Sequence, residues 1–178
     1  MKKIVKAFFG STKIEDDLAY ETLFAEHIKA EFSAEEIICF YDRFRYGESK
    51  FDYLMRKLLS RVLLKRAGKG VKIAPGVVFM HPETIEIGDG VFIGAQTVIQ
   101  GRKDGLCRIG NKVWIGPNSY FDARDLIIGD NVGWGPGAKV LGSEHTGIPV
   151  EIPVINTDLV IEPVRIPRDL QPSTAPIT

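Results

Sequence analysis

The second half of the chain repeats with a period of six residues, and this period restricts the fold more than any other feature. A large apolar residue opens each unit, glycine usually follows it, and a small or β-branched residue stands four places after the opening residue. A short strand with a tight corner needs this order, because the first side chain fills a narrow interior and the small one fits the turn. Amphipathic helices and alternating hairpin strands have other periods.

Three units form one turn of a triangular coil, whose flat faces we name A, B and C. Every step from A to B and from B to C is six residues. The steps from C back to A are 8, 10 and 7 residues, and the step from Val140 to Ile166 is 26. All insertions therefore fall at one corner, and the longest is a loop over 146–165. Face A contains Ile87, Ile109 and Ile128; face B contains Ile73, Ile93, Ile115 and Trp134; and face C contains Phe79, Ile99, Phe121 and Val140.

The first part of the chain has helical periodicity instead. Apolar residues at helical spacing predict a helix over 18–28, and Ser33 with Glu36 forms a capping box ahead of a second helix. A third apolar stripe covers 51–63, and Gly68 is its predicted stop. We expect three helices before the repeats.

The fold class is therefore mainly β, a hexapeptide-repeat prism with an α-helical N-terminal extension. The extension spans 1–67, the prism 68–166, and a tail without repeats 167–178. The tail reads "PRDLQPSTAPIT", and its prolines cannot donate to a strand ladder. We expect that the repeat is truncated or frameshifted here; the alternative is that the tail caps a shortened prism.

Composition restricts the partners. Lysine and arginine number 23, as do aspartate and glutamate, so the formal net charge of zero gives no bulk attraction to nucleic acid. The apolar patch near the N-terminus is too short for a signal peptide, and no apolar run is long enough to span a membrane. We expect a cytoplasmic protein without a nucleic-acid partner.

The third predicted helix ends in a basic cluster, which allows two interpretations. Its basic residues suit a helix that lies on a membrane surface and feeds a lipid-linked substrate to the prism. They also suit the negative end of the helix dipole, with the apolar face packed on the prism, and we favour this packing. The cluster contains Arg56, Lys57, Arg61, Lys65 and Arg66.

Histidine and cysteine residues are few. Cys39 and Cys107 lack a CxxC spacing, so we predict two buried thiols, with Cys107 in a small inward slot, and no disulfide or metal site. His27 is expected to pack in the first helix, and His81 to lie in a solvated turn. His145 is the sixth residue of the unit opened by Val140, at the insertion corner where the longest loop begins.

The units "IGDGVF", "IGAQTV", "IGNKVW" and "IGPNSY" resemble those of the hexapeptide-repeat acyltransferases, over roughly positions 70–166. The stretch "GWGPGAKVLGSEHTGIPVEIPVINTDLVIEPVRI" is similar to the catalytic segment of the maltose, galactoside and polysaccharide O-acetyltransferases. In that branch a histidine follows the glycine-rich coil where an extended loop leaves the prism, and His145 matches it. The resemblance implies a left-handed parallel β-helix, acetyl-CoA as acyl donor, no permanently bound cofactor, a homotrimer and active sites in grooves between subunits.

Acyl transfer to a sugar hydroxyl needs a base, and imidazole, which titrates near neutral pH, suits this task. The sequence does not identify the acceptor. His145 is therefore the predicted general base. Its second ring nitrogen needs an acceptor: Glu144, Asp125 one coil earlier, or a main-chain carbonyl. Related enzymes use an asparagine against the acceptor or thioester, which makes Asn118 a further candidate. The alternative is that Asn118 only forms a turn. Trp114 is a candidate subunit contact.

Two other function classes remain. A scaffold or interaction protein without activity fits a truncated prism. A γ-type carbonic anhydrase shares the fold but needs three histidines around zinc, and the three histidines here include one in the helical part. Residues that would bind the acyl-CoA are not identified by the sequence.

Overall fold

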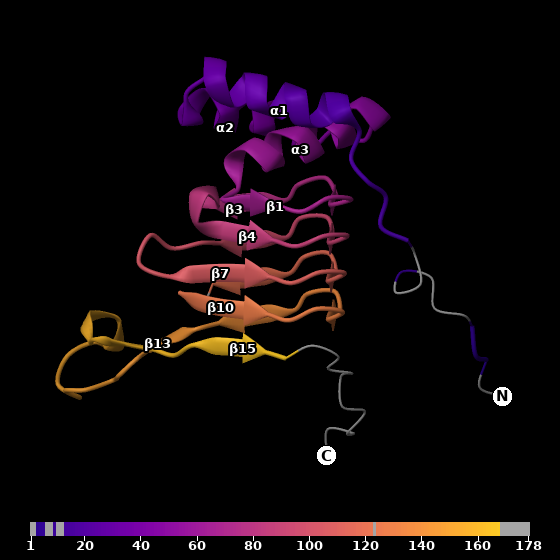
Figure 1. Cartoon of the computed structure of the whole chain (residues 1–178). Helices are drawn as coiled ribbons and strands as arrows, with labels where there is room; N and C mark the ends of the chain where they lie inside the picture. The colour runs from indigo at the N-terminus through magenta and orange to yellow at the C-terminus, as the bar shows by residue number, and fades with distance from the viewer. Residues whose placement is uncertain (1–2, 6–8, 10–12, 123, 168–178) are drawn as a thin grey trace.

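Helices stand on a stack of short parallel strands (Figure 1). The computed structural model describes residues 3–5, 9, 13–122 and 124–167. The tail predicted over 167–178 thus lies outside the described residues, apart from its first residue. The helices form one end of the molecule and are called the cap below: α1 (Ala19–Glu31), α2 (Ala34–Phe44) and α3 (Lys50–Leu63).

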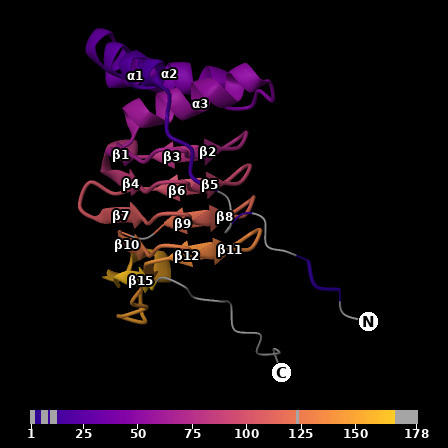
Figure 2. The same cartoon turned by 45° about the vertical axis from the view of Figure 1, so that its right-hand side comes forward.

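The strands form three parallel sheets that coincide with the predicted faces (Figure 2). In face A, for example, Ile87 pairs with Ile109, and Ile109 with Ile128. The mainly β, parallel solenoid is therefore confirmed, while its left-handed sense stays a prediction. Face A contains β1 (Arg66–Ala67), β4 (Ile85–Ile87), β7 (Leu106–Ile109), β10 (Asp125–Ile128) and β15 (Val164–Ile166); face B contains β2 (Lys72–Ile73), β5 (Phe92–Ile93), β8 (Trp114–Ile115) and β11 (Gly133–Trp134); face C contains β3 (Val78–Met80), β6 (Val98–Gln100), β9 (Tyr120–Asp122) and β12 (Lys139–Leu141).

The interior of the prism is a column of residues that open the hexads. Ile93, Ile99, Ile115 and Phe121 have no exposed surface. Trp134 takes the place that isoleucine has in the three earlier coils of face B, and its ring packs edge-on against Phe121 with centroids 5.8 Å apart. The indole is larger than the isoleucine side chain that it replaces in the last coil of this face.

The two tight corners of each coil use the left-handed backbone conformation. Four residues in register adopt positive φ at each corner, so the chain turns without a longer loop. These residues are Gly70, Gly90, Lys112 and Asn131 between faces A and B, and Gly76, Gln96, Asn118 and Gly137 between faces B and C.

The helix starts follow local capping. Ser33 accepts from the backbone of Glu36, and the Glu36 carboxylate accepts from the backbone of Ser33, which confirms the predicted capping box. A second box, which we did not predict, joins Ser49 and Asp52 ahead of α3. The first strand begins at Arg66, so the prism starts two residues before the predicted boundary at 68.

The basic residues of α3 bind the cap and the prism together. Arg56 is fully buried and donates to the carbonyl oxygens of Phe44 at 2.7 Å, Gly47 at 2.7 Å and Ile73 at 3.1 Å. One guanidinium thus joins the end of α2, the connection to α3 and the first coil. The reading of α3 as a packing helix is supported by these contacts, whereas a membrane-surface helix would keep its cations outside.

An ionic cluster joins the segment before α1 to α3. Asp17 pairs with Lys57 at 2.7 Å and with Arg61, and it accepts from the backbone N–H of Gly70 at 3.2 Å. Glu21 also pairs with Lys57, at 2.6 Å. The cluster ties the N-terminal segment to both the cap and the corner between faces A and B.

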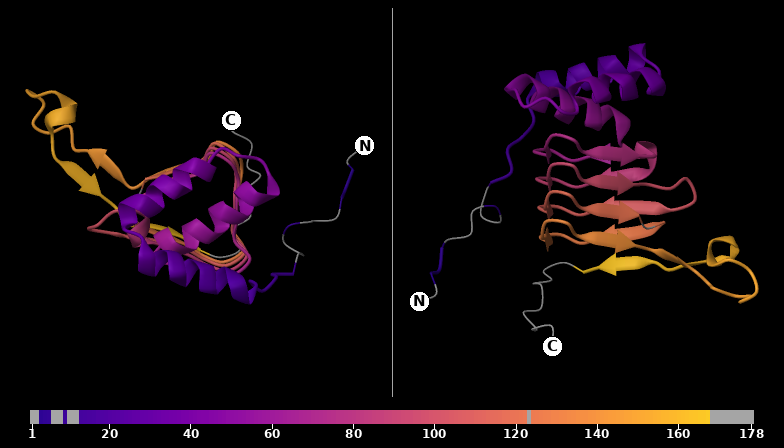
Figure 3. Two further views of the ribbon diagram at one scale, coloured as in Figure 1. Left: turned by 90° about the horizontal axis from the view of Figure 1, so that it is seen from above. Right: turned by 180° about the vertical axis from the view of Figure 1, so that it is seen from behind.

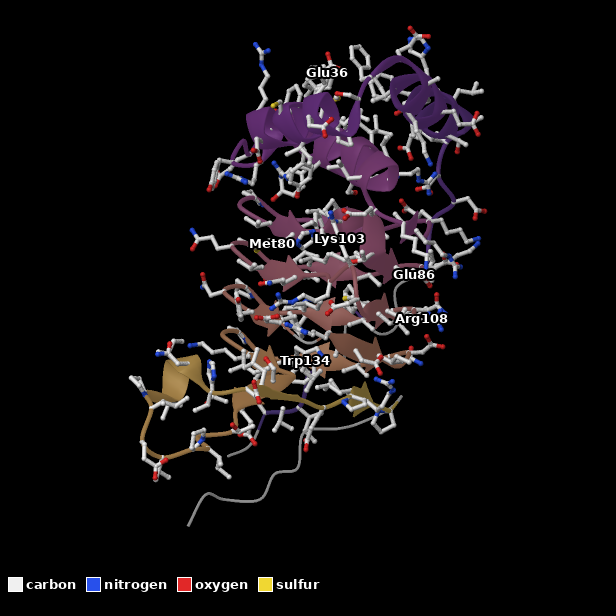
Figure 4. The ribbon with its side chains drawn as sticks, turned by 90° about the vertical axis from the view of Figure 1, so that its left-hand side faces the viewer. Glu36, Met80, Glu86, Lys103, Arg108 and Trp134 are labelled. Atoms are coloured by element: carbon white, nitrogen blue, oxygen red, sulfur yellow. The ribbon has the colours of Figure 1, made fainter. Side chains whose placement is uncertain are left out.

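Face A carries a further ionic contact on its outside. Glu86 of β4 lies beside Arg108 of β7 at 3.0 Å and beside Lys65 at 2.7 Å (Figure 4). The Lys65 ammonium, followed by the Arg108 guanidinium, lowers the pKa of the Glu86 carboxyl. This pairing shows that Lys65 also contacts the prism.

Two expectations were wrong. Cys39 lies on the exposed side of α2, whereas Cys107 is buried as predicted. His27 is exposed rather than packed, because Glu21 and Ala25 are the buried residues of α1. His81 is exposed and its backbone adopts the left-handed conformation, which agrees with the predicted turn residue.

Among the described residues, no helix has the length and apolar character needed to cross a membrane.

Candidate functional site

The longest insertion forms a hairpin that projects from the corner between faces C and A (Figure 3). Its strands β13 (Ser143–His145) and β14 (Leu159–Ile161) pair antiparallel. Gly142 anchors the base, because its N–H donates to Asp122 and its carbonyl accepts from Glu162, both at 3.0 Å. We call residues 143–161 the arm. The sequence predicted a loop here and missed the strand pairing.

His145 ends the first strand of the arm, and its ring is held by the main chain. Its Nδ1 lies 3.0 Å from the carbonyl oxygen of Thr157. A carbonyl can only accept, so Nδ1 carries the hydrogen and Nε2 of the neutral ring has a free lone pair. Of the three predicted acceptors, the structure therefore places the main-chain carbonyl against His145.

The carbonyl that holds His145 is itself fixed. The Thr157 hydroxyl donates to the Val154 carbonyl at 2.7 Å and accepts from the N–H of Gly147 at 3.2 Å. The N–H of Thr146 donates to the Asp158 carbonyl at 2.8 Å. Thr157 is also the one buried residue in the stretch 148–163. No sequence signal singled it out, because threonine is common in loops.

Asp125 lies at the start of β10 and is engaged elsewhere. Its carboxylate pairs with Arg165 at 2.5 Å, and Arg165 also donates to the Asp125 carbonyl at 2.9 Å. In the described part of the chain, no hydrogen bond joins Asp125 to His145. The carboxylate instead ties β10 to the returning strand β15, so the idea that Asp125 orients His145 finds no contact to support it.

Glu144 and Asn118 also stand apart from the ring of His145. Glu144 is exposed and, as the neighbouring residue in an extended strand, points to the other side of the arm. Asn118 lies at the corner between faces B and C, with φ of 59° and its N–H bonded to the Ala95 carbonyl at 2.8 Å. This is a different corner from the one that carries the arm, so one chain does not bring Asn118 to His145.

The arm exposes many apolar side chains. Val150 is 82% exposed, Ile155 74% and Ile148 71%, far above the core residues of the prism. The strand side chains are also open, at 40 to 44%. Exposed apolar patches are typical of sites that bind proteins, membranes or ligands. Its further members are Ile152, Val154, Leu159, Val160 and Ile161.

Two cavities lie elsewhere. One of about 520 Å³ adjoins face B and the connection between α2 and α3, and one of about 440 Å³ lies between the cap and Pro82. Neither is lined by His145. Among the residues that the structure describes, no group of three or more His, Cys, Asp or Glu side chains is arranged to hold a metal ion.

A scan of protein-family models gives no match, and a search of curated proteins gives none either. What the chain can do is therefore inferred from the repeat and from the side chains around His145.

Proposed function

We propose that the chain is an acyltransferase of the hexapeptide-repeat class, with left-handed coils, that transfers acetyl from acetyl-CoA to a hydroxyl of a sugar or polysaccharide precursor. The observation that supports it most is the bond between Nδ1 of His145 and the Thr157 carbonyl. That bond fixes the tautomer and the ring orientation that a general base needs.

In this proposal, Nε2 of His145 removes the proton of the acceptor hydroxyl while its oxygen attacks the thioester carbonyl carbon. The tetrahedral intermediate collapses, the carbon–sulfur bond breaks, and the imidazolium returns the proton to the thiolate of CoA. The Thr157 carbonyl stabilises the imidazolium, because its hydrogen bond strengthens when the ring is charged.

The proposed active unit is a homotrimer. The arm exposes Ile148, Val150 and Ile155, and a neighbouring copy that covers them would also enclose His145, whose ring is only partly buried. A scaffold that binds another protein through the same arm is the second candidate, since the exposed arm suits either role. The two candidates differ in whether CoA is released.

The test is His145→Ala, assayed by release of free CoA from acetyl-CoA with a panel of mono- and oligosaccharides. Loss of a positioned base is expected to lower turnover by about 10²-fold or more. His27→Ala is the matched control, because His27 is exposed on α1 and remote from the arm. Turnover of His145→Ala within about threefold of the parent would contradict the base role. Absence of CoA release from the parent with every acceptor would favour the scaffold.

A further inference from the structure

The cavity of about 520 Å³ beside face B has four aromatic side chains among the twelve residues that line it. Tyr46 and Tyr53 come from the cap, and Phe92 and Trp114 come from face B. Its volume and lining are typical of sites for small organic ligands, which combine apolar walls with a few polar groups. The cavity is lined by residues of the cap and of the corner and strands of face B, whereas His145 ends β13, so the two are separate sites.

The aromatic rings of face B form a stack that is open at one end. Phe92 and Trp114 are partners in register, with ring centroids 5.8 Å apart and an angle of 14° between the planes. The next residue in register is Gly133. In the described part of the chain, no atom of another segment lies within 4 Å of the place where a Cβ of Gly133 would be. Among the described residues, the indole of Trp114 thus stacks on Phe92 on one side, and the register position on its other side is a glycine with open space beside it.

The charge around the tyrosines decides which ligand class fits. The guanidinium carbon of Arg45 lies 4.9 Å from the ring centre of Tyr46, and that of Arg56 lies 4.4 Å from the ring centre of Tyr53. Nε of Arg45 and Nη2 of Arg56 are buried and have no hydrogen-bond partner among the described residues. Aromatic cavities often bind cations, but here guanidinium groups already lie over both tyrosine rings, that of Arg45 being paired with Asp42 at 2.7 Å.

The polar side chains of the cavity are a carboxylate and an amide. Glu48 and Gln96 both line it and both are exposed to solvent. A carboxylate accepts hydrogen bonds and an amide both donates and accepts, which matches the neighbouring hydroxyls of a sugar ring. A pyranose has in addition an apolar C–H face that packs flat on an indole.

We propose that this surface binds an oligosaccharide. One pyranose ring stacks on the open side of Trp114 over Gly133, and the adjoining rings extend into the cavity, where Glu48 and Gln96 bind their hydroxyls. This binding does not depend on acetyl transfer, because it uses a different part of the prism and needs no acetyl-CoA.

The experiment uses tryptophan fluorescence, since the chain has two tryptophans. Trp134→Phe leaves Trp114 as the single reporter and removes the Trp134 indole N–H, which is buried without a partner among the described residues. Maltotriose, cellotriose and chitotriose are titrated in turn, and at least one is expected to change the emission with a dissociation constant of about 1 mM or below.

Gly133→Val is the decisive variant in this background. Its Cβ meets open space and valine suits a strand, so the fold is kept while the open side of Trp114 is filled. Binding is expected to weaken by about tenfold or more. Gly135→Val is the matched control, because its Cβ also meets open space but Gly135 does not pair with Trp114; its affinity should equal that of the parent.

Three results would overturn the proposal, once circular dichroism shows that the variants are folded. The first is equal affinity of the Gly133→Val and Gly135→Val proteins for the bound trisaccharide. The second is saturable binding of ADP or choline at Trp114 while no trisaccharide binds up to about 10 mM. The third is a change in assembly mass with Gly133→Val, which would assign the Trp114 surface to a contact between copies.

Discussion

The cap and the arm are attached to opposite ends of one prism (Figure 1). The cap has both buried and exposed apolar side chains, whereas those of the arm are all exposed. In the cap, Ile37, Tyr41 and Leu59 are almost completely buried, because three helices and the first coils cover one another. In the arm, Val150 and Ile155 are mostly exposed, because two short strands have no third element to pack on. Apolar residues are therefore buried only where another helix or strand packs against them.

The closed region also contains polar groups that its geometry must satisfy. Arg56 binds three carbonyl oxygens, and the Tyr41 hydroxyl donates to the Val77 carbonyl at 3.1 Å. The arm instead satisfies its backbone locally, through the β13–β14 ladder and Thr157. A two-stranded hairpin is marginally stable alone. This difference is the reason to test whether another copy of the chain covers the arm.

Arg56→Leu should produce the largest effect, because it removes the hydrogen bonds that join the cap to the first coil of the prism. Three buried carbonyl oxygens would lose their donor, so we expect the free energy of unfolding to fall by about 3 kcal/mol or more. Urea denaturation monitored by circular dichroism measures it. Arg43→Leu, on an exposed position of α2, is the control and should change stability by less than about 0.5 kcal/mol. Equal effects of the two variants would contradict the role of Arg56.

Making the arm polar tests whether another copy covers it. Val154→Ser combined with Ile155→Ser removes two exposed apolar side chains, 60% and 74% exposed in the single chain. We expect the dissociation constant of the assembly to rise by about 30-fold or more, which is about 2 kcal/mol, with little change in the stability of the single chain. Analytical ultracentrifugation measures the assembly. Leu23→Ser on α1 is the matched exposed apolar control and should leave the mass unchanged.

Asp17→Asn should weaken the attachment between the N-terminal segment and the cap by about 1–2 kcal/mol at neutral pH. Burial alone would raise the pKa of Asp17, but the hydrogen bonds from Lys57 and Gly70 and the charges of Lys57 and Arg61 outweigh it, so its pKa lies below the ordinary value. The stabilisation is therefore complete above about pH 4, the unfolded value, and is lost as the pH falls through the folded value.

Thermal melts at pH 7 and in acid measure this difference. The gap between the parent and Asp17→Asn should shrink as the pH falls below about 4. Asp104→Asn removes the exposed partner of Arg124 and serves as the control, with a smaller gap at both pH values. A gap for Asp17→Asn that is independent of pH would show that its charge is not what matters.

The smallest expected effect is a difference in reactivity between the two thiols, one exposed in the cap and one buried in the prism. Burial raises the pKa of the Cys107 thiol to about 12, so it should not react with iodoacetamide in the folded protein. Cys39 is exposed and should react. Mass spectrometry is expected to show one modification in the native parent and none in Cys39→Ser. Modification of native Cys39→Ser would mean that the prism opens.

The coils were predictable because the same pattern of neighbouring residues recurs in every repeat. Each isoleucine–glycine step specifies the same strand and corner, and the register of Ile87, Ile109 and Ile128 follows from the position of the insertions. The capping box at Ser33 is equally local. His145 was found in the same way, since it stands where the period stops.

The sequence by itself thus determined the period, the three faces and the corner that carries the arm, because these depend on residues close together in the chain. The tertiary structure decided which partners the polar side chains find: Thr157 for His145, Arg165 for Asp125 and three carbonyls for Arg56. Those contacts join residues 9 to 40 positions apart in the chain. Such pairs leave no periodic signal, because a hydrogen bond depends on where two backbones meet in space and not on the spacing of residue types along the chain.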